Sequence, residues 1–289
     1  MSYRHIILIV CIVMVWGFNS VAIKLGLNDF PPLFMTVLRF IVVATISVPF
    51  SKIKKAQLVT LIPLSFTFGF MHFSLLFLGT SFTDAGTSAV IVQLGTPIAV
   101  LISTFFFKDS LSRAQIAGLF ISFMGVVLIS GSPTLSSGWA VAILLCSATG
   151  WALSNIIIKR SPPVNPITLT GWIALLAIPQ VGVLSWFFEN DQLVALLHSS
   201  WKGWFGVIYS AVGASILAYS SWYYLLRKYH VNIVMPWSLL TPAFAVITGC
   251  FVLGDEMNSF KLLGTTLIVS GTVICSLTHL KRGSPPLKK

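Results

Sequence analysis

The stretch Leu94-Gly-Thr-Pro97 opens an apolar run that ends in Lys-Asp-Ser-Leu-Ser112. A similar stretch near the C-terminus, Leu240-Thr-Pro242, opens an apolar run that ends in Gly-Asp-Glu-Met-Asn258. The prolines lie 145 positions apart (97 and 242), and the aspartates that follow lie 146 apart (109 and 255). One unit therefore occurs twice in this chain. Later glycines keep the register and are predicted packing positions, because small residues let helices approach closely in lipid: Gly118 with Gly264, and Gly125 with Gly271.

The start of each unit carries a weaker form of the repeat. Trp16-Gly-Phe-Asn19, with Lys24 farther on, lines up loosely with Trp151-Ala-Leu-Ser-Asn155, with Lys159 farther on. The offset here is 135 positions (16 and 151). The alignment places the first helix of each half at these two stretches.

Together these motifs resemble the EamA family of the drug/metabolite transporter superfamily. The Trp-Gly-x-Asn run with its later Lys, Arg39 in the second helix, and each Thr-Pro followed by an acidic residue carry the resemblance, over about residues 6 to 280. It implies two five-helix EamA units that move a small metabolite across a membrane. The first unit departs from the second, with Lys108-Asp109 in place of Gly254-Asp255, which leaves mirror-image motion of the two gates open.

The composition predicts an integral membrane protein. Hydrophobic residues make up 56% of the 289 residues, and charged residues make up 9%. A soluble domain carries roughly 25% charged residues, so this chain lacks the polar residues needed to cover a water-facing surface. The net charge of +11 does not indicate nucleic-acid binding, because the basic residues are scattered in short loops between apolar segments.

Ten apolar segments approach the roughly 20 residues that cross the hydrocarbon of a bilayer. They predict an all-α membrane protein with ten transmembrane helices. The first EamA unit covers 1–131, the second covers 137–280, and 281–289 forms a basic cytoplasmic tail. The longest loop, about 187–203, shows no sign of a soluble domain. The predicted spans are 6–27, 32–50, 57–78, 85–107, 114–131, 137–158, 166–187, 204–226, 231–253 and 260–279.

Lysine and arginine residues set the predicted orientation. With a cytoplasmic N-terminus, 14 of the 18 fall in inside segments, whereas Lys24, Lys202 and Lys261 fall outside and Arg39 lies within the second helix. The positive-inside rule then places both termini in the cytoplasm, in a bacterial inner membrane. Five helices per unit is an odd number, so the second unit is expected to be inverted relative to the first. Inverted repeats are common in transporters, with the substrate site near the midplane.

No acidic residue lies within a predicted span. The seven occur at helix ends or in loops: Asp29, Asp84, Asp109, Glu189, Asp191, Asp255 and Glu256. Ion-coupled carriers often keep a carboxylate inside the membrane, so its absence favours a uniporter or exchanger. Paired carboxylates, metalloprotease motifs and Ser/His/Asp sets are also missing at membrane depth, which argues against an enzyme. The four cysteines lack Cys-x-x-Cys spacing and are predicted to be small buried apolar residues, so neither a metal nor a cofactor is expected.

An aromatic ring and an amide share one face in the first helix of each unit. Trp16 and Asn19 are three positions apart, and Trp151 and Asn155 are four apart, so each pair projects from the same side of a helix. If the two faces meet between the halves, they form an amphipathic pocket with rings to stack and amides to hydrogen-bond. Alternatively, the asparagines join one helix to another, as is common in membranes.

Three further deep residues belong to the predicted site. Arg39 lies about seven residues into its helix, ~10 Å below the outer surface, and either binds a substrate carboxylate or snorkels outward. His72 lines a cavity, relays a proton or packs in the core. Tyr219 is deep in the eighth helix, whereas its neighbours are expected in the aromatic belt at the inner interface: Trp222, Tyr223 and Tyr224.

The repeat prolines Pro97 and Pro242 are predicted hinges or gates, with a simple kink as the alternative. Proline within a helix frees the carbonyl four residues earlier, so the backbone acceptors of Gln93 and Ser238 are expected to be open. Such breaks line cavities or act as hinges in membrane proteins. Trp237 adds an aromatic ring beside Ser238.

The sequence therefore predicts an inner-membrane secondary transporter that exports small polar metabolites, with neutral amino acids or related compounds favoured, by alternating access. Its partners are a small-molecule substrate and the lipid bilayer, and it acts as a monomer or homodimer. A proton-coupled multidrug or metabolite efflux pump and a passive channel remain alternatives. The predicted substrate-binding residues are Trp16, Asn19, Arg39, His72, Gln93, Trp151, Asn155, Tyr219, Trp237 and Ser238.

Overall fold

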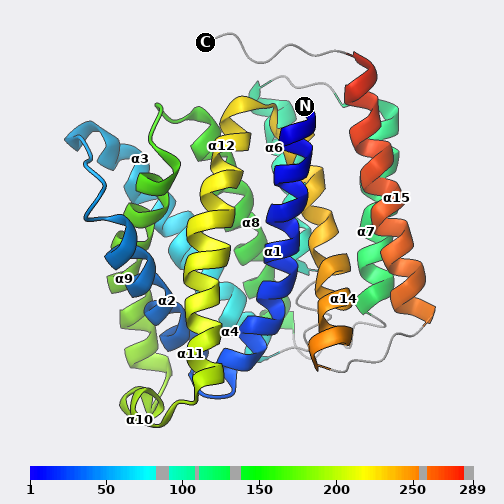
Figure 1. Ribbon diagram of the computed structural model, residues 1–289. Coiled ribbons are helices and arrows are strands. Elements are labelled where there is room, and N and C mark those ends of the chain that lie inside the picture. Colours follow the sequence, from blue (N-terminus) through cyan, green and yellow to red (C-terminus); the bar gives the residue numbers. More distant parts are fainter. Residues whose placement is uncertain (83–90, 108–110, 131–137, 254–258, 283–289) are drawn as a thin grey trace.

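Helices account for nearly all of the chain that the structure describes, and those ranges contain no strand (Figure 1). The computed structural model describes residues 1–82, 91–107, 111–130, 138–253 and 259–282. The first half contains α1 (Tyr3–Leu27), α2 (Pro32–Ser47), η1 (Lys55–Gln57), α3 (Leu58–Leu64), η2 (Ser65–Ser74), α4 (Leu75–Ser81), α6 (Gly95–Phe107) and α7 (Arg113–Ser130). The second half contains α8 (Gly138–Arg160), α9 (Pro166–Phe188), α10 (Gln192–His198), α11 (Trp201–Ile208), η3 (Tyr209–Tyr219), α12 (Ser220–Lys228), α13 (Val231–Val234), η4 (Met235–Leu240), α14 (Thr241–Leu253) and α15 (Ser259–Arg282).

Six helical segments in the described ranges are long and apolar enough to cross a membrane, which makes the chain a multi-pass membrane protein. They coincide with six of the ten predicted spans. The other four predicted spans fall on α2, α6, α7 and α15, and the first residues of 85–107 lie outside the described ranges. The count of ten remains a prediction. The six segments are Tyr3–Leu27, Lys55–Gly79, Gly138–Arg160, Pro166–Phe188, Trp201–Lys228 and Met235–Val252.

The structure corrects the sequence-based expectations at three places. Helix α2 ends at Ser47 rather than near residue 50, because Pro49 has no backbone N–H with which to continue the helical hydrogen bonds. The predicted loop at 187–203 contains the short helix α10. Cys11 and Cys146 are exposed on the bundle rather than buried, since an apolar side chain facing lipid needs no protein cover.

Two spans contain a π-helical segment at matching positions of the two halves. Segment η2 begins at Ser65 and η3 begins at Tyr209, 144 positions later. π-helical turns use hydrogen bonds between residues five apart, are rare, and occur frequently at functional sites. No residue pattern in the sequence predicted either segment.

Corresponding elements of the two halves make corresponding contacts. Helix α1 packs against η3 and α14, and α8 packs against η2 and α6. Other large contacts join α2 to α9, α7 to α15 and α1 to α11. The N-terminus and the end of α15 lie at one end of the bundle, with α10 at the other (Figure 1).

Glycines form the contact between α7 and α15. A Cβ atom at Gly125 would lie 2.6 Å from the carbonyl oxygen of Gly264, and one at Gly271 would lie 2.6 Å from that of Gly118. The Ser122 hydroxyl donates to the Ile268 carbonyl at 3.1 Å, which adds a polar bond across this seam. These four glycines are therefore packing positions, as their spacing predicts.

Basic side chains cap two helix C-termini at the end of the bundle where the chain begins. Lys159 of α8 donates to the carbonyl oxygens of Leu226 and Tyr229 at the end of α12, at 2.8 and 2.6 Å. In return, Arg227 of α12 donates to the carbonyls of Ile158 and Ser161 at the end of α8. Cations stabilise helix C-termini, where backbone acceptors have no partner within the helix.

An acidic side chain caps the N-terminus of α2, the helix that carries Arg39. Both carboxylate oxygens of Glu189 accept backbone N–H groups of α2, from Leu33 at 2.6 Å and from Phe34 at 2.8 Å. A third bond comes from the Ser185 hydroxyl at 2.8 Å. The carboxylate thus satisfies orphan donors at a helix N-terminus and ties α2 to the end of α9.

We expect the Glu189→Ala variant to unfold at a lower temperature than the wild type in detergent. Hydrogen bonds to a charged group contribute about 1.5–3 kcal/mol each, so removing several should cost at least about 2 kcal/mol. The matched control is Asp191→Asn, which removes a charge beside Glu189 at a residue whose side chain caps nothing. Equal unfolding midpoints for both variants would show that this carboxylate does not anchor α2.

Candidate functional site

Tryptophans from both halves meet through a third tryptophan in the middle of the bundle. Trp16 of α1 lies 5.0 Å from Trp222 of α12 between ring centroids, and Trp151 of α8 lies 6.4 Å from the same ring. Tyr219 of η3 lies 4.6 Å from Trp16. The structure thus places Trp16, Trp151 and Tyr219 in one aromatic cluster around Trp222.

Trp222 and Tyr223 are not part of an interfacial belt. Trp222 is 0% exposed and Tyr223 is 1% exposed, whereas Tyr224 is 42% exposed. The nearby basic residues Arg227 and Lys228 suggested an interfacial position. However, the face of α12 that carries Trp222 and Tyr223 turns toward α1, α8 and α9.

Both predicted amides bond to other helices in this structure. The Asn155 Oδ1 accepts from the Trp222 indole at 2.8 Å, and its Nδ2 donates to the Trp151 carbonyl at 2.7 Å. The Asn19 Oδ1 accepts from the Ser210 hydroxyl of η3 at 2.7 Å. These bonds correspond to the helix-joining alternative. They also hold the rings of the cluster in place.

His72 of η2 is fixed against α8. Its Nδ1 lies 3.3 Å from the Ser147 carbonyl oxygen, which only accepts, so this nitrogen donates. The Ser147 hydroxyl in turn donates to the His72 carbonyl at 2.8 Å. The imidazole is 5% exposed and lies between the rings of Phe68 and Trp151, at 5.5 and 6.3 Å. His72 is therefore a wall residue of the aromatic cluster.

The two repeat prolines adjoin a contact between the halves. The Ser238 carbonyl accepts the Gln93 side-chain amide at 3.4 Å, as expected for an acceptor freed by Pro242. It also accepts the Thr241 N–H, because η4 is a 3-10 turn that precedes α14. The Ser238 hydroxyl lies 2.9 Å from that of Thr96.

Not all of the predicted residues near the prolines belong to the aromatic cluster. Pro242 lies in the first turn of α14, where proline is tolerated, rather than inside a helix. The side chain of Pro97 lies outside the described part. Trp237 is partly buried against the core but makes no ring contact with the described residues of the cluster. Gly95 links the two regions, because a Cβ there would lie 2.8 Å from the Trp151 ring.

Arg39 is almost fully buried, at 2% exposed. Its Nε donates to the Ser215 hydroxyl of η3 at 2.8 Å, and the guanidinium carbon lies 4.2 Å from the centroid of the Phe73 ring. Neither Nη1 nor Nη2 has a hydrogen-bond partner among the described residues. Arg39 therefore does not snorkel, since its charged group faces the protein interior.

A small cavity adjoins this arginine. Its volume is about 10 Å³, close to the smallest space that holds one water molecule. An amino acid does not fit there, so this part of the centre is closed in the structure. The lining residues come from α2, both π segments, α9 and α12: Phe40, Val43, Phe68, Phe73, Thr170, Ile173, Ala174, Ser215, Tyr219 and Tyr223.

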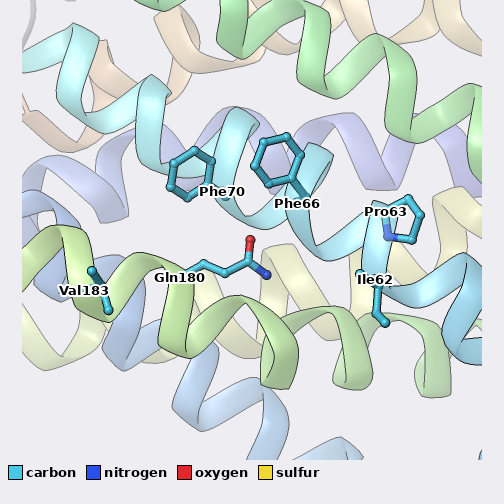
Figure 2. A pocket seen from close by; sticks show the side chains of 6 residues that line it. All are labelled: Ile62, Pro63, Phe66, Phe70, Gln180 and Val183. Carbon is cyan, nitrogen blue, oxygen red and sulfur yellow. The ribbon is translucent and has the colours of Figure 1, made fainter.

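A larger groove of about 700 Å³ lies between the η2 span and α9, on the outside of the bundle (Figure 2). Figure 2 shows the Gln180 amide pointing toward Phe66 and Phe70. That amide already donates to the Ser65 hydroxyl at 2.9 Å and to the Leu176 carbonyl at 2.8 Å. The other lining residues are apolar, and two of them, Ile62 and Val183, are more than half exposed. This apolar groove therefore suits lipid chains better than a polar metabolite. The smaller central site is the candidate substrate site.

Several residues of the centre were not predicted from the sequence. Phe68, Phe73 and Ser215 lie on π segments, where helical spacing does not predict the face. Ser147 and Trp222 hold His72 and Asn155, and nothing in the sequence pairs them. One signal was present: the dense tyrosines and serines of 209–224 marked that span as unusually polar.

A multi-pass helical bundle with buried polar and aromatic side chains in its middle is an arrangement typical of membrane transporters. Residues 4–131 and residues 138–277 each match the sequence model of the EamA-like transporter family. The chain belongs to this family, as its motifs suggested.

Relatives and a solved structure agree with this assignment. A protein of Escherichia coli K12 named "Probable amino-acid metabolite efflux pump" is 31% identical over 287 residues, which cover 95% of each chain. One of the same name from Salmonella typhimurium is 30% identical over 286 residues, again 95% of each chain. The E. coli K12 "Uncharacterized inner membrane transporter YedA" is 24% identical, over 91% of this chain and 88% of its own. A crystal structure with 16% identity covers 98% of this chain and 100% of its own at a TM-score of 0.77, which shows the shared fold.

Proposed function

We propose that this protein is an inner-membrane secondary transporter that exports neutral amino acids or related metabolites by alternating access. The names of its relatives support the substrate class and the direction of transport. The name of the YedA relative supports an inner-membrane location. The closed centre supports alternating access, because a substrate enters only if the helices around it separate.

The architecture proposed for this function is a pair of inverted five-helix units, over 1–131 and 137–280. Its support is the matching contacts of the halves, with α1 against η3 and α14, and α8 against η2 and α6. Both termini are placed in the cytoplasm, because basic residues gather at the bundle end near the N-terminus. Asp109 and Asp255, the acidic residues of the repeat, lie outside the described ranges.

The observation that carries the proposal is the aromatic and amide centre, uncharged apart from Arg39, to which both halves contribute. Trp16 and Trp151 would cover the apolar part of a substrate, while Asn19 and Asn155 would exchange their present bonds for its polar ends. His72 and Tyr219 form the surrounding wall. Gln93, Ser238 and Trp237 would contribute from the proline-flanked segments, with Pro97 and Pro242 as hinges. Arg39 adds the one deep positive charge of the predicted site.

The proposed mode is uniport or exchange without a titrating carboxylate. The three described acidic residues, Asp29, Glu189 and Asp191, lie near α10 rather than in the centre. A proton-coupled efflux pump and a passive channel are the competing functions. A pump follows the pH gradient, whereas a channel neither saturates nor exchanges.

The test is counterflow in proteoliposomes loaded with unlabelled neutral amino acids, with and without a pH gradient. We expect labelled leucine to enter by saturable exchange at the same rate under both conditions. A Trp16→Ala, Trp151→Ala variant should lose at least about tenfold in kcat/KM, because each ring contributes several kcal/mol of burial that binding would use. Trp186→Ala, at an 80% exposed ring of α9, is the control. Flux that tracks the gradient and vanishes in His72→Ala would instead establish proton coupling.

A further inference from the structure

Arg39 is a buried cation among the described residues, and only one of its three side-chain nitrogens forms a hydrogen bond. The Arg39 Nε donates to the Ser215 hydroxyl, and the guanidinium packs against the Phe73 ring. These two contacts fix the guanidinium plane. The N–H groups of both Nη atoms remain without acceptors. A charged group in this state is costly to bury, and buried charges in proteins are normally paired.

A second unpaired polar group lies at the same place. The Tyr223 hydroxyl is buried and has no partner, and Tyr223 lines the small central cavity. Ser215 and Phe73, the two residues that hold Arg39, line that cavity as well. The guanidinium thus contacts two residues that line the cavity, and the phenol belongs to a third lining residue on a different helix.

No described carboxylate neutralises this site. Asp29 accepts from the backbone and hydroxyl of Ser200 at 2.9 and 2.6 Å, and the hydroxyl lowers the pKa of the Asp29 carboxyl. Glu189 caps α2, and Asp191 begins α10. Each of these carboxylates thus has a role at the N-terminal end of α2 or beside α10, and none of them bonds to Arg39, so the described residues provide no counter-charge for this guanidinium.

The π-helical hydrogen-bond spacing places side chains of η2 and η3 on the wall of the small cavity. Phe68 and Phe73 are five positions apart on η2, and both line the cavity with 4.9 Å between their rings. On η3, the Ser215 hydroxyl bonds to the carbonyl of Ser210, again five positions away, at 3.0 Å. In an α-helix, residues five apart project about 140° from each other and would not share a face. Both π segments thus turn their side chains toward Arg39.

We propose that Arg39 and Tyr223 form an anion subsite for a carboxylate group, with Phe73 and Ser215 orienting the guanidinium. A guanidinium presents parallel N–H donors that match the two oxygens of a carboxylate. This inference rests on the proposed function in one respect, since the carboxylate in the transport cycle is that of the exported amino acid. The cavity widens when the carboxylate enters.

The test uses ligand pairs that differ only in the carboxylate. Purified protein in detergent is titrated with L-leucine, with L-leucinamide and with acetate, and tryptophan fluorescence and the unfolding midpoint are followed. We expect the wild type to bind leucine about 10- to 100-fold more tightly than leucinamide, the range of a charge-assisted hydrogen-bond pair. Arg39→Gln should remove this preference, and Tyr223→Phe should reduce it. Lys24→Gln, at an exposed cation of α1, should leave it unchanged.

The acetate arm separates this inference from the proposed function. If acetate raises the wild-type midpoint but not that of Arg39→Gln, while leucine and leucinamide bind alike, the subsite takes free carboxylates and the amino acid assignment fails alone. If Arg39→Gln does not fold, Arg39→Lys and Tyr223→Phe carry the comparison. A folded Arg39→Gln that binds acetate and leucine as tightly as the wild type overturns the subsite.

Discussion

The Gly125→Leu variant is expected to yield no monodisperse protein in mild detergent. A Cβ at this position would lie 2.6 Å from the Gly264 carbonyl oxygen and 2.8 Å from the Ile268 backbone nitrogen. These are backbone atoms, so α7 and α15 would have to separate to admit a leucine. Overpacking of a tight core costs about 1–3 kcal/mol, and separation of a whole helix pair adds the loss of its packing and of the Ser122 bond.

The matched control for this substitution is Gly182→Leu in α9. Nothing lies within 4 Å of the Cβ that Gly182 would gain, so the larger side chain extends into open space. Size-exclusion profiles and unfolding midpoints of the two variants, prepared in parallel, give the comparison. If Gly125→Leu elutes and unfolds like Gly182→Leu, the α7–α15 seam does not depend on close backbone approach.

The Asn155→Leu variant is expected to lose at least about tenfold in transport and to unfold at a lower temperature. Asn155 provides the acceptor for the Trp222 indole at 2.8 Å, and Trp222 is 0% exposed. A buried donor left without its partner costs about 1–3 kcal/mol. Trp222 also lies between Trp16 and Trp151, so a shift of its ring disturbs both halves of the proposed pocket.

Addition of Trp222→Phe to this variant separates stability from transport. Replacement of both partners by apolar groups removes the unpaired donor and can be nearly neutral for stability. We therefore expect the double variant to regain most of the lost unfolding midpoint while transport stays low. A single variant as stable as the wild type would mean that the indole finds another acceptor.

The sequence predicted what depends on spacing along the chain. The seven-residue spacing of Gly118 and Gly125 predicted packing positions on one helix face, since helix geometry alone puts them there, but it did not predict α15 as the partner. Pro242 predicted that the Ser238 carbonyl would lack its usual helical donor, because proline removes a known donor at a known offset; the structure supplies the Thr241 N–H and the Gln93 amide instead. The convergence of Trp16 and Trp151 followed from duplication of one unit.

What escaped prediction depends on tertiary contacts or on an irregular helix. Trp222 and Tyr223 follow a serine-rich stretch and precede Arg227, so position along the helix suggested an interface. Only the packing against α1 and α8 shows them buried. Hydropathy likewise cannot tell a lipid-facing cysteine such as Cys11 from a buried one, because both environments are apolar. The partners of Asn19 and Asn155 depend on where η3 and α12 lie.

The π segments have a consequence for how related sequences are aligned. Each segment accommodates residues at a wider hydrogen-bond spacing than the helices around it. Loss of a single residue there would let the span revert to a regular helix and would rotate everything beyond it by about 100°. In the η3 span, that rotation would carry Trp222 and Tyr223 off the central face. A length difference of one residue within 65–74 or 209–219 in a relative is therefore expected to change which side chains face the centre.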